Sequence, residues 1–214
     1  MKYHDITHDD MMNGTGLRVC LWCSGCDHHC RNCQNPITWN PNDGVQFDES
    51  AKKEIFDELS KDYIAGITFT GGDPLHSQNL KDVSDLVSEL RVKYPISRKT
   101  DTIYRENYNS KHNILTRNSD EIRLSYPEKT IWLYTGYTWE QIMYPVVTDD
   151  FNPERDKLLK MRRDIVKQCD VLVDGRYEED KRDITYHWAG STNQRVIDVQ
   201  ESLKQNQVVL WKNS

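Results

Sequence analysis

Three cysteines, Cys26, Cys30 and Cys33, stand close together at the spacing C-x3-C-x2-C. Cysteine thiolates at such short spacings bind one metal centre together, and they are the ligands that hold iron–sulfur clusters in proteins. A [4Fe–4S] cube has four iron corners and is ordinarily closed by four thiolates, so three thiolates leave one iron open to a ligand that is not protein. The loop therefore predicts a reactive iron–sulfur site with these three cysteines as the metal ligands.

The run from Cys20 to Cys30, C-x2-C-x2-C-x3-C, also has the spacing found in bacterial ferredoxins, which would indicate an electron carrier. Two features oppose this alternative. Arg31 stands where the ferredoxin run has proline, and Cys20 and Cys23 lie in an apolar segment that predicts a strand. Residues three apart on a strand point to opposite faces, so Cys20 and Cys23 cannot both face one cluster.

A zinc site is the other alternative for this group of residues. Structural zinc prefers two separated ligand pairs, whereas His28 and His29 lie inside the loop, too close to its cysteines for an ordinary tetrahedral site. We expect the two histidines to cover the loop or to be exposed. Cys20, Cys23 and Cys169 are expected to be small buried residues, as free cysteine commonly is.

Composition narrows the class of protein further. The 214 residues suit a single domain, 1–214, and no apolar run approaches the roughly 20 residues that span a bilayer. Residues 1–5 lack the apolar stretch of a signal peptide, so we expect a cytoplasmic protein whose cysteines stay reduced. The net charge of −6 and the scattering of basic residues among acids argue against nucleic acid as partner, and no membrane partner is expected in the absence of a long apolar run.

Hydrophobic periodicity predicts strands that alternate with helices. The expected strands are Leu17–Cys23, Ile64–Thr70, Thr130–Thr135, Asp170–Val173 and Arg195–Val199. The expected helices begin after Asp48, at Gln78 and at Pro153, and the last two end near Tyr94 and Gln168. Alternation of this kind indicates an α/β fold with a mostly parallel sheet and outer helices, in which ligands gather at the C-terminal ends of the strands.

The C-x3-C-x2-C loop resembles the signature of the radical S-adenosylmethionine (SAM) enzymes. Further blocks resemble, in the same order, the anaerobic ribonucleoside-triphosphate reductase activating proteins. These blocks are NGTGLR at 13–18, NPITW at 35–39, GGDPLH at 71–76, TGY at 135–137, VLVDG at 171–175 and GSTNQ at 190–194. They cover most of the chain, except for a polar segment at about 96–128 that is expected to be an insertion.

The resemblance implies a partial, open (β/α) barrel of radical SAM type that binds a [4Fe–4S] cluster and SAM. One electron from the cluster would cleave SAM to a 5′-deoxyadenosyl radical, and this radical would take hydrogen from a glycine in the large subunit of anaerobic ribonucleoside-triphosphate reductase. The electron would come from an external donor such as flavodoxin or ferredoxin. The alternatives are an activase of another glycyl-radical enzyme of the formate-lyase type and a non-catalytic iron–sulfur electron carrier.

The resemblance also implies where SAM would be held. Gly71 and Gly72, after a strand, let the backbone approach a ligand closely, and Asp73 can accept hydrogen bonds from the ammonium group of SAM. The full set of expected SAM contacts is Asn32, Cys33, Gln34, Gly71, Gly72, Asp73, Thr135 and Gly136. The wider family often has an aromatic residue at the position of Asn32, so the adenine pocket has no assigned side chain. Trp39 is expected either as an aromatic wall or in the core.

Overall fold

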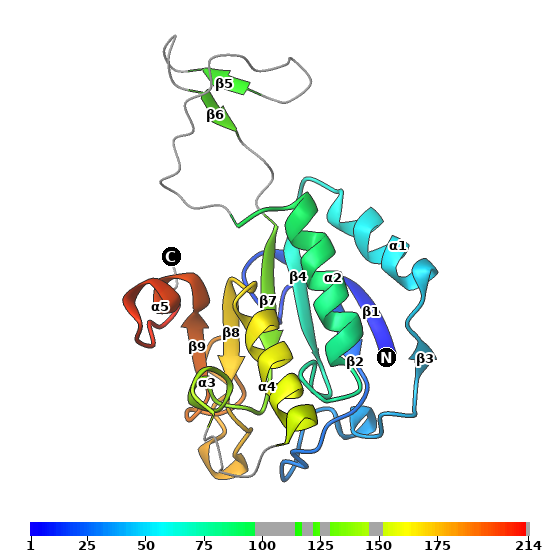
Figure 1. Cartoon of the computed structure of the whole chain (residues 1–214), viewed down its shortest axis with the longest axis vertical. Helices are drawn as coiled ribbons and strands as arrows, with labels where there is room; N and C mark the ends of the chain where they lie inside the picture. The colour runs from blue at the N-terminus through cyan, green and yellow to red at the C-terminus, as the bar shows by residue number, and fades with distance from the viewer. Residues whose placement is uncertain (97–113, 117–121, 125–128, 146–151, 213–214) are drawn as a thin grey trace.

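A computed structural model of the chain describes residues 1–96, 114–116, 122–124, 129–145 and 152–212, and an open seven-stranded sheet lies at its centre (Figure 1). The strands, in their order across the sheet, are β3 (Val45–Gln46), β1 (Lys2–Asp10), β2 (Leu17–Cys23), β4 (Ile64–Gly71), β7 (Thr130–Tyr134), β8 (Val171–Asp174) and β9 (Arg195–Asp198). The four central strands, β2, β4, β7 and β8, run parallel. β1 and β9 pair antiparallel with this centre, and β3 pairs antiparallel with β1.

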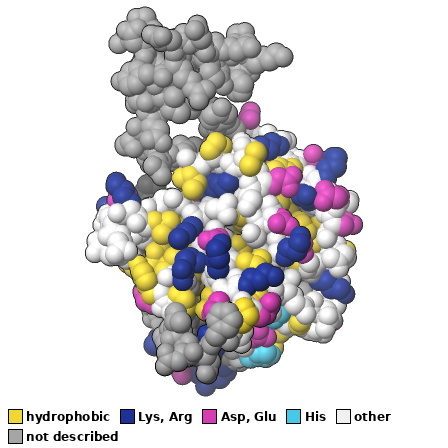
Figure 2. Space-filling view, viewed as in Figure 1, with side chains coloured by type: hydrophobic (Ala, Val, Ile, Leu, Met, Phe, Trp, Pro, Cys, Tyr) yellow, Lys and Arg dark blue, Asp and Glu magenta, His cyan; other side chains and the backbone are white. Residues whose placement is uncertain are grey.

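Three helices, α1 (Glu49–Leu59), α2 (Leu80–Lys93) and α4 (Pro153–Val166), lie along one face of the sheet in Figure 1. Two shorter helices, α3 (Trp139–Met143) and α5 (Val199–Gln205), follow β7 and β9. Figure 2 shows Lys and Arg side chains interspersed with Asp and Glu over the helix-covered face, and ion pairs one helical turn apart, such as Lys160 with Asp164, join the two kinds.

Local sequence explains where the helices begin. The Asp48 carboxylate accepts hydrogen bonds at 3.0 Å from the backbone N–H groups of Ser50 and Ala51, which satisfies donors that have no partner inside α1. Pro153 opens α4 at a position where its missing N–H costs nothing, and the Asn152 side chain caps that helix. These are the residues at which the sequence predicts helix starts.

The two faces of β2 show how the sheet divides the interior. Val19, Leu21 and Cys23 are fully buried and pack in the core beneath the helices. The residues between them point to the opposite face because side chains alternate along a strand. On that face Trp132, Val171, Val173 and Val196 form a second core cluster, against which Trp188 and Trp211 pack.

The predicted α/β class is confirmed. The five predicted strands and the last two predicted helices agree to within two residues at each end, and the first helix begins where it was predicted. The sequence did not reveal β1, because Ile6 is its only buried residue and its pairing with β2 is interrupted by two register shifts. It also did not reveal the short helices α3 and α5, which have too few turns for a hydrophobic period.

Of the polar segment predicted as an insertion at about 96–128, the structure describes Ile96 and two short strands, β5 (Ile114–Thr116) and β6 (Ile122–Leu124), which pair antiparallel. The rest of that insertion lies outside the described residues. Within the part of the chain that is described, no helix is long and apolar enough to cross a membrane.

Candidate iron–sulfur and SAM site

The cysteine loop follows the C-terminal end of β2. Its first ligand candidate, Cys26, donates its backbone N–H to the Trp39 carbonyl at 3.0 Å, and Cys33 donates its backbone N–H to the Cys30 carbonyl at 3.1 Å. Cys26 is buried, whereas Cys30 and Cys33 are partly exposed. All three line one cavity of about 540 Å³ that opens beside the ends of the central strands. The structure therefore brings the three predicted ligands together.

Burial governs the chemistry of these thiols. It raises the pKa of the Cys26 thiol to about 12, and it also raises the pKa of Cys30, although a backbone hydrogen bond from Tyr177 opposes the shift at Cys30. Thiolates are the form that binds iron, and a nearby metal charge offsets the cost of burying them. Burial therefore favours the neutral thiols in the absence of a metal.

Two glycines at the end of β4 hold the cysteine loop against the sheet. Gly71 has φ of +97°, and a Cβ there would lie 2.8 Å from the backbone nitrogen of Cys23. A Cβ on Gly72 would lie 2.5 Å from the carbonyl oxygen of Gly25. These neighbours are backbone atoms that cannot move aside, so both positions require glycine. Both glycines line the cavity.

Asp73, directly after these glycines, is 1 % exposed. Its carboxylate accepts hydrogen bonds from Thr135 Oγ1 at 2.9 Å, from the Gly136 backbone N–H at 3.2 Å and from His28 Nε2 at 2.7 Å. Asp73 thus joins the cysteine loop to the ends of both β4 and β7. It does not itself line the cavity, whereas His28, Thr135 and Gly136 do.

The expected SAM contacts divide into two groups. Six of the eight residues line the cavity, namely Cys33, Gln34, Gly71, Gly72, Thr135 and Gly136. The other two, Asn32 and Asp73, do not. Asn32 is exposed and has a positive φ of 56°, so it turns the loop between Cys30 and Cys33.

The segment between β8 and β9 forms another wall of the cavity. The Gln194 side chain folds this segment by donating to the Gly175 carbonyl at 2.9 Å and by accepting from the Gly190 backbone N–H at 3.0 Å. Tyr177 and Gly190 line the cavity, and a Cβ on Gly190 would lie 3.1 Å from the Tyr177 ring. Arg31 of the cysteine loop forms an ion pair with Asp180 of this segment.

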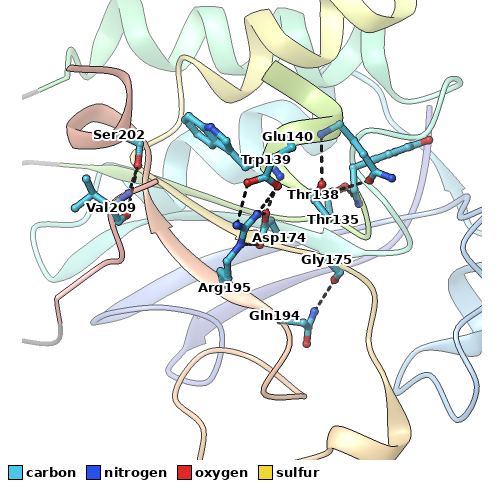
Figure 3. A network of polar contacts seen from close by, with 12 residues as sticks. Thr135, Thr138, Trp139, Glu140, Asp174, Gly175, Gln194, Arg195, Ser202 and Val209 are labelled. Carbon is cyan, nitrogen blue, oxygen red and sulfur yellow. Dashed lines mark hydrogen bonds and ion pairs between the residues drawn. The ribbon is translucent and has the colours of Figure 1, made fainter. Parts of the chain in front are cut away.

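A second buried carboxylate, Asp174, fixes the end of β8 (Figure 3). It accepts from the Trp139 backbone N–H at 2.7 Å and from Arg195 Nε at 3.0 Å. Arg195 also binds both carboxylate oxygens of Glu140, at 3.0 and 2.8 Å, and lowers the pKa of Glu140. This network joins α3, β8 and β9 beside the cavity, to which Gly175 contributes.

The remaining cysteines lie as their positions predict. Cys20, Cys23 and Cys169 are each fully buried, and burial raises the pKa of each thiol to about 12. Cys23 packs in the core under the helices, and Cys20, three residues earlier on β2, lies on the opposite face of the strand. The two therefore do not face one cluster.

The sequence of this chain is similar to known proteins over most of its length. The chain matches the family model described as a 4Fe-4S single cluster domain, at residues 12–119 and 107–197. It is also 35 % identical to the anaerobic ribonucleoside-triphosphate reductase-activating protein of Enterobacteria phage T4, over 92 % of this chain and 93 % of that protein. Proteins of the same name from Pasteurella multocida and Escherichia coli K12 are 32 % and 31 % identical, over 91 % and 92 % of this chain and 95 % and 97 % of their own lengths.

The chain belongs to this family of activating proteins. The predicted resemblance to the reductase-activating proteins is confirmed. A 4Fe-4S domain spans the cysteine loop and most of the sheet.

The donor chemistry of the site fits the cluster that the family implies. Asn35 donates its backbone N–H to Cys33 Sγ at 3.4 Å, and Trp39 has a buried Nε1–H without a hydrogen-bond partner in the described part of the chain. Trp39 lines the cavity, and its ring packs 4.9 Å from that of His29. Across the described ranges, no three His, Cys, Asp or Glu side chains are grouped to hold a single metal ion.

Sequence reasoning missed some of the residues that line the cavity. These include the aromatic residues Trp22, Tyr134, Tyr177, Tyr186 and Trp188. His28, which was expected to cover the loop or to be exposed, also lines the cavity. For Trp22 and Tyr134 the period-two pattern of their strands could have placed them on the face opposite the helices. No local signal marks the other aromatic residues, since their segment has no regular period.

Proposed function

We propose that this protein activates anaerobic ribonucleoside-triphosphate reductase by generating a glycyl radical on it, through reductive cleavage of SAM at a [4Fe–4S] cluster. Cys26, Cys30 and Cys33 are the proposed cluster ligands, and the open, mostly parallel sheet is the proposed partial barrel of radical SAM type. The observation that carries the proposal is that these three thiols, and no fourth cysteine, face one cavity at the C-terminal ends of the parallel strands within the described residues.

The size of the cavity supports an enzyme over an electron carrier. Its volume of about 540 Å³ lies within the range of roughly 300–1,000 Å³ that is usual for small-molecule sites. An electron carrier needs only a buried cluster and no adjoining space. The cavity can therefore take SAM beside the open corner of the cluster.

When bound, the cluster and SAM supply the difficult chemistry, in which one electron breaks the C5′–S bond to give methionine and a 5′-deoxyadenosyl radical that takes hydrogen from a glycine of the partner. The residues of the chain position the cluster and SAM. Gly71 and Gly72 bring backbone to the cavity without a Cβ, and Thr135 and Gly136 extend the same wall from β7. Residues of the segment from Gly175 to Gln194 line another side of the cavity, and Gln194 ties the two ends of this segment together.

The proposed partner is the reductase because the related proteins from phage T4, Pasteurella multocida and Escherichia coli K12 are named as its activating proteins. No flavin domain or second cysteine run stands in the sequence, so the electron is proposed to come from a separate donor such as flavodoxin or ferredoxin. An activase of formate-lyase type would use the same chemistry on another glycine, and no described feature favours it.

The test uses the reconstituted protein under anaerobic conditions with dithionite and SAM. It is incubated separately with an anaerobic ribonucleoside-triphosphate reductase and with a formate-lyase-type enzyme, and the glycyl radical is quantified by electron paramagnetic resonance. We expect the radical on the reductase and none on the formate lyase. A radical only on the lyase, or SAM cleavage without a radical on either protein, would contradict the proposed partner.

A further inference from the structure

The Asp73 carboxylate already has a full set of donors in this structure. The Leu75 backbone N–H donates to Oδ1 at 2.8 Å, and His28 and Gly136 donate to Oδ2. The Thr135 hydroxyl lies within hydrogen-bonding distance of both oxygens, at 3.0 Å from Oδ1 and 2.9 Å from Oδ2, so it can fill the second site on Oδ1. An ionised carboxylate offers about four lone-pair sites. These four donors use that capacity, so Asp73 has no acceptor left for the ammonium group of a ligand.

His28 stands between Asp73 and the cavity. Its side chain is 7 % exposed, its Nε2–H donates to Asp73, and it lines the cavity that Asp73 does not reach. Its ring packs edge-on against Tyr137 with 4.7 Å between the ring centroids. The Tyr137 ring is in turn covered by the Arg162 guanidinium at 4.4 Å. Each of these contacts restricts the rotation of His28.

Gly136 confirms how closely His28 is fitted. A Cβ at this position would lie 2.3 Å from Cδ2 and 2.6 Å from Nε2 of His28, far inside van der Waals contact. The φ of Gly136 is not in the left-handed region, so its backbone does not need glycine. The absence of a side chain there leaves room for the imidazole ring.

On these grounds we propose that His28 is a positioning residue. Through its hydrogen bond to His28, Asp73 fixes the cysteine loop to the strand ends and holds the imidazole ring in the wall of the SAM cavity. Asp73 does not itself bind the ammonium group of SAM. This inference rests on the proposed function for the identity of the ligand. The hydrogen bond between the two side chains spans 45 positions of sequence and joins the loop between two cluster ligands to the end of β4. Loss of the imidazole would leave the loop without this tie.

The test is a double-mutant cycle of His28→Leu and Asp73→Asn in the cluster-loaded protein, with SAM binding measured by equilibrium dialysis. We expect each single substitution to raise the Kd of SAM about tenfold, which corresponds to the loss of one charge-assisted hydrogen bond. Asp73→Asn should add less than a twofold loss in the His28→Leu protein. Equal losses from Asp73→Asn in both backgrounds, or tighter binding after His28→Leu, would show that Asp73 binds SAM directly and would overturn the proposal.

A conservative variant separates positioning from simple packing. His28→Gln keeps an N–H donor near the position of Nε2, so it should bind SAM within about threefold of the wild type. His8→Leu is the matched control, because His8 also pairs with a carboxylate, Glu54, but on the surface at 2.8 Å. His28→Gln as weak as His28→Leu would contradict a role for the donated hydrogen bond.

Amide hydrogen exchange on the cluster-free protein gives a readout that does not need SAM. His28→Leu should raise exchange across residues 26–33 about tenfold, and His28→Gln should not. Unchanged exchange in His28→Leu would overturn the positioning role. A wild-type protein that fails to bind SAM at all would instead count against the proposed function, and the exchange result would still decide the role of His28.

Discussion

Gly136→Ala tests the packing of His28 in the cluster-free protein. The new Cβ would stand 2.3 to 2.6 Å from three ring atoms of His28, so the ring must retreat by about 1 Å to reach ordinary contact. That shift would stretch the 2.7 Å hydrogen bond to Asp73 beyond hydrogen-bonding distance. Losing a charge-assisted hydrogen bond costs about 1.5–3 kcal/mol, and replacing glycine at a compatible φ regains about 0.4–1 kcal/mol. The net loss of unfolding free energy should be about 1–2 kcal/mol.

Urea unfolding of the cluster-free protein measures this loss, with the slope against denaturant as a check on two-state behaviour. The control is the same substitution in a His28→Ala protein, where no ring stands in the way. There Gly136→Ala should stabilise the fold by about 0.4–1 kcal/mol, so the sign of the effect should reverse. An equal destabilisation in both backgrounds would refute the reasoning, since the clash would then lie elsewhere.

Three further predictions follow from other parts of the site. Trp39→Phe should change the unfolding free energy of the cluster-free protein by less than about 2 kcal/mol, because the loss of a buried N–H without a partner in the described part of the chain offsets the packing volume that is lost. A larger loss on urea unfolding would contradict this. Gly72→Ala should lower the unfolding free energy by about 3 kcal/mol because its Cβ meets immobile backbone, and a wild-type urea midpoint would contradict this. Arg195→Met should lower it by about 3 kcal/mol at neutral pH by leaving Asp174 unpaired. Because Arg195 lowers the folded-state pKa of Glu140, that pair stabilises the wild type above the ordinary glutamate range and less as the pH falls, so the difference between wild type and variant should shrink in acid urea titrations.

The elements that position the site were predictable because their signals are local. β2 is rich in Leu, Val and Trp and ends at Cys23, two residues before the glycine that begins the cysteine loop, and α1 begins after a capping aspartate. β1 carries no such signal, because its outer position in the sheet leaves most of its side chains partly exposed. Its antiparallel pairing with β2 is a long-range choice that periodicity does not encode.

In the candidate site, too, residues with a local signal were predictable, and residues that depend on long-range contacts were not. Spacing alone identified the three cysteines that share the cavity, and glycine after a strand identified Gly71 and Gly72. The role of His28 was not predictable, since its partner Asp73 lies 45 residues away and the two meet only when β2 and β4 pair. The sequence indicated Asp73 as a ligand contact, and periodicity could not reveal the four protein donors that its carboxylate meets in the fold.

The most direct test of the account is anaerobic reconstitution with iron and sulfide, reduction with dithionite, and quantification of 5′-deoxyadenosine after SAM is added. The wild type should cleave SAM, Cys26→Ala, Cys30→Ala and Cys33→Ala should each abolish cleavage, and Cys20→Ala and Cys23→Ala should retain it. No cleavage by a wild-type protein with a fully loaded cluster would contradict the radical mechanism and favour an electron carrier. Loss of cleavage in Cys20→Ala, with stability and iron content unchanged, would contradict the three-thiolate site.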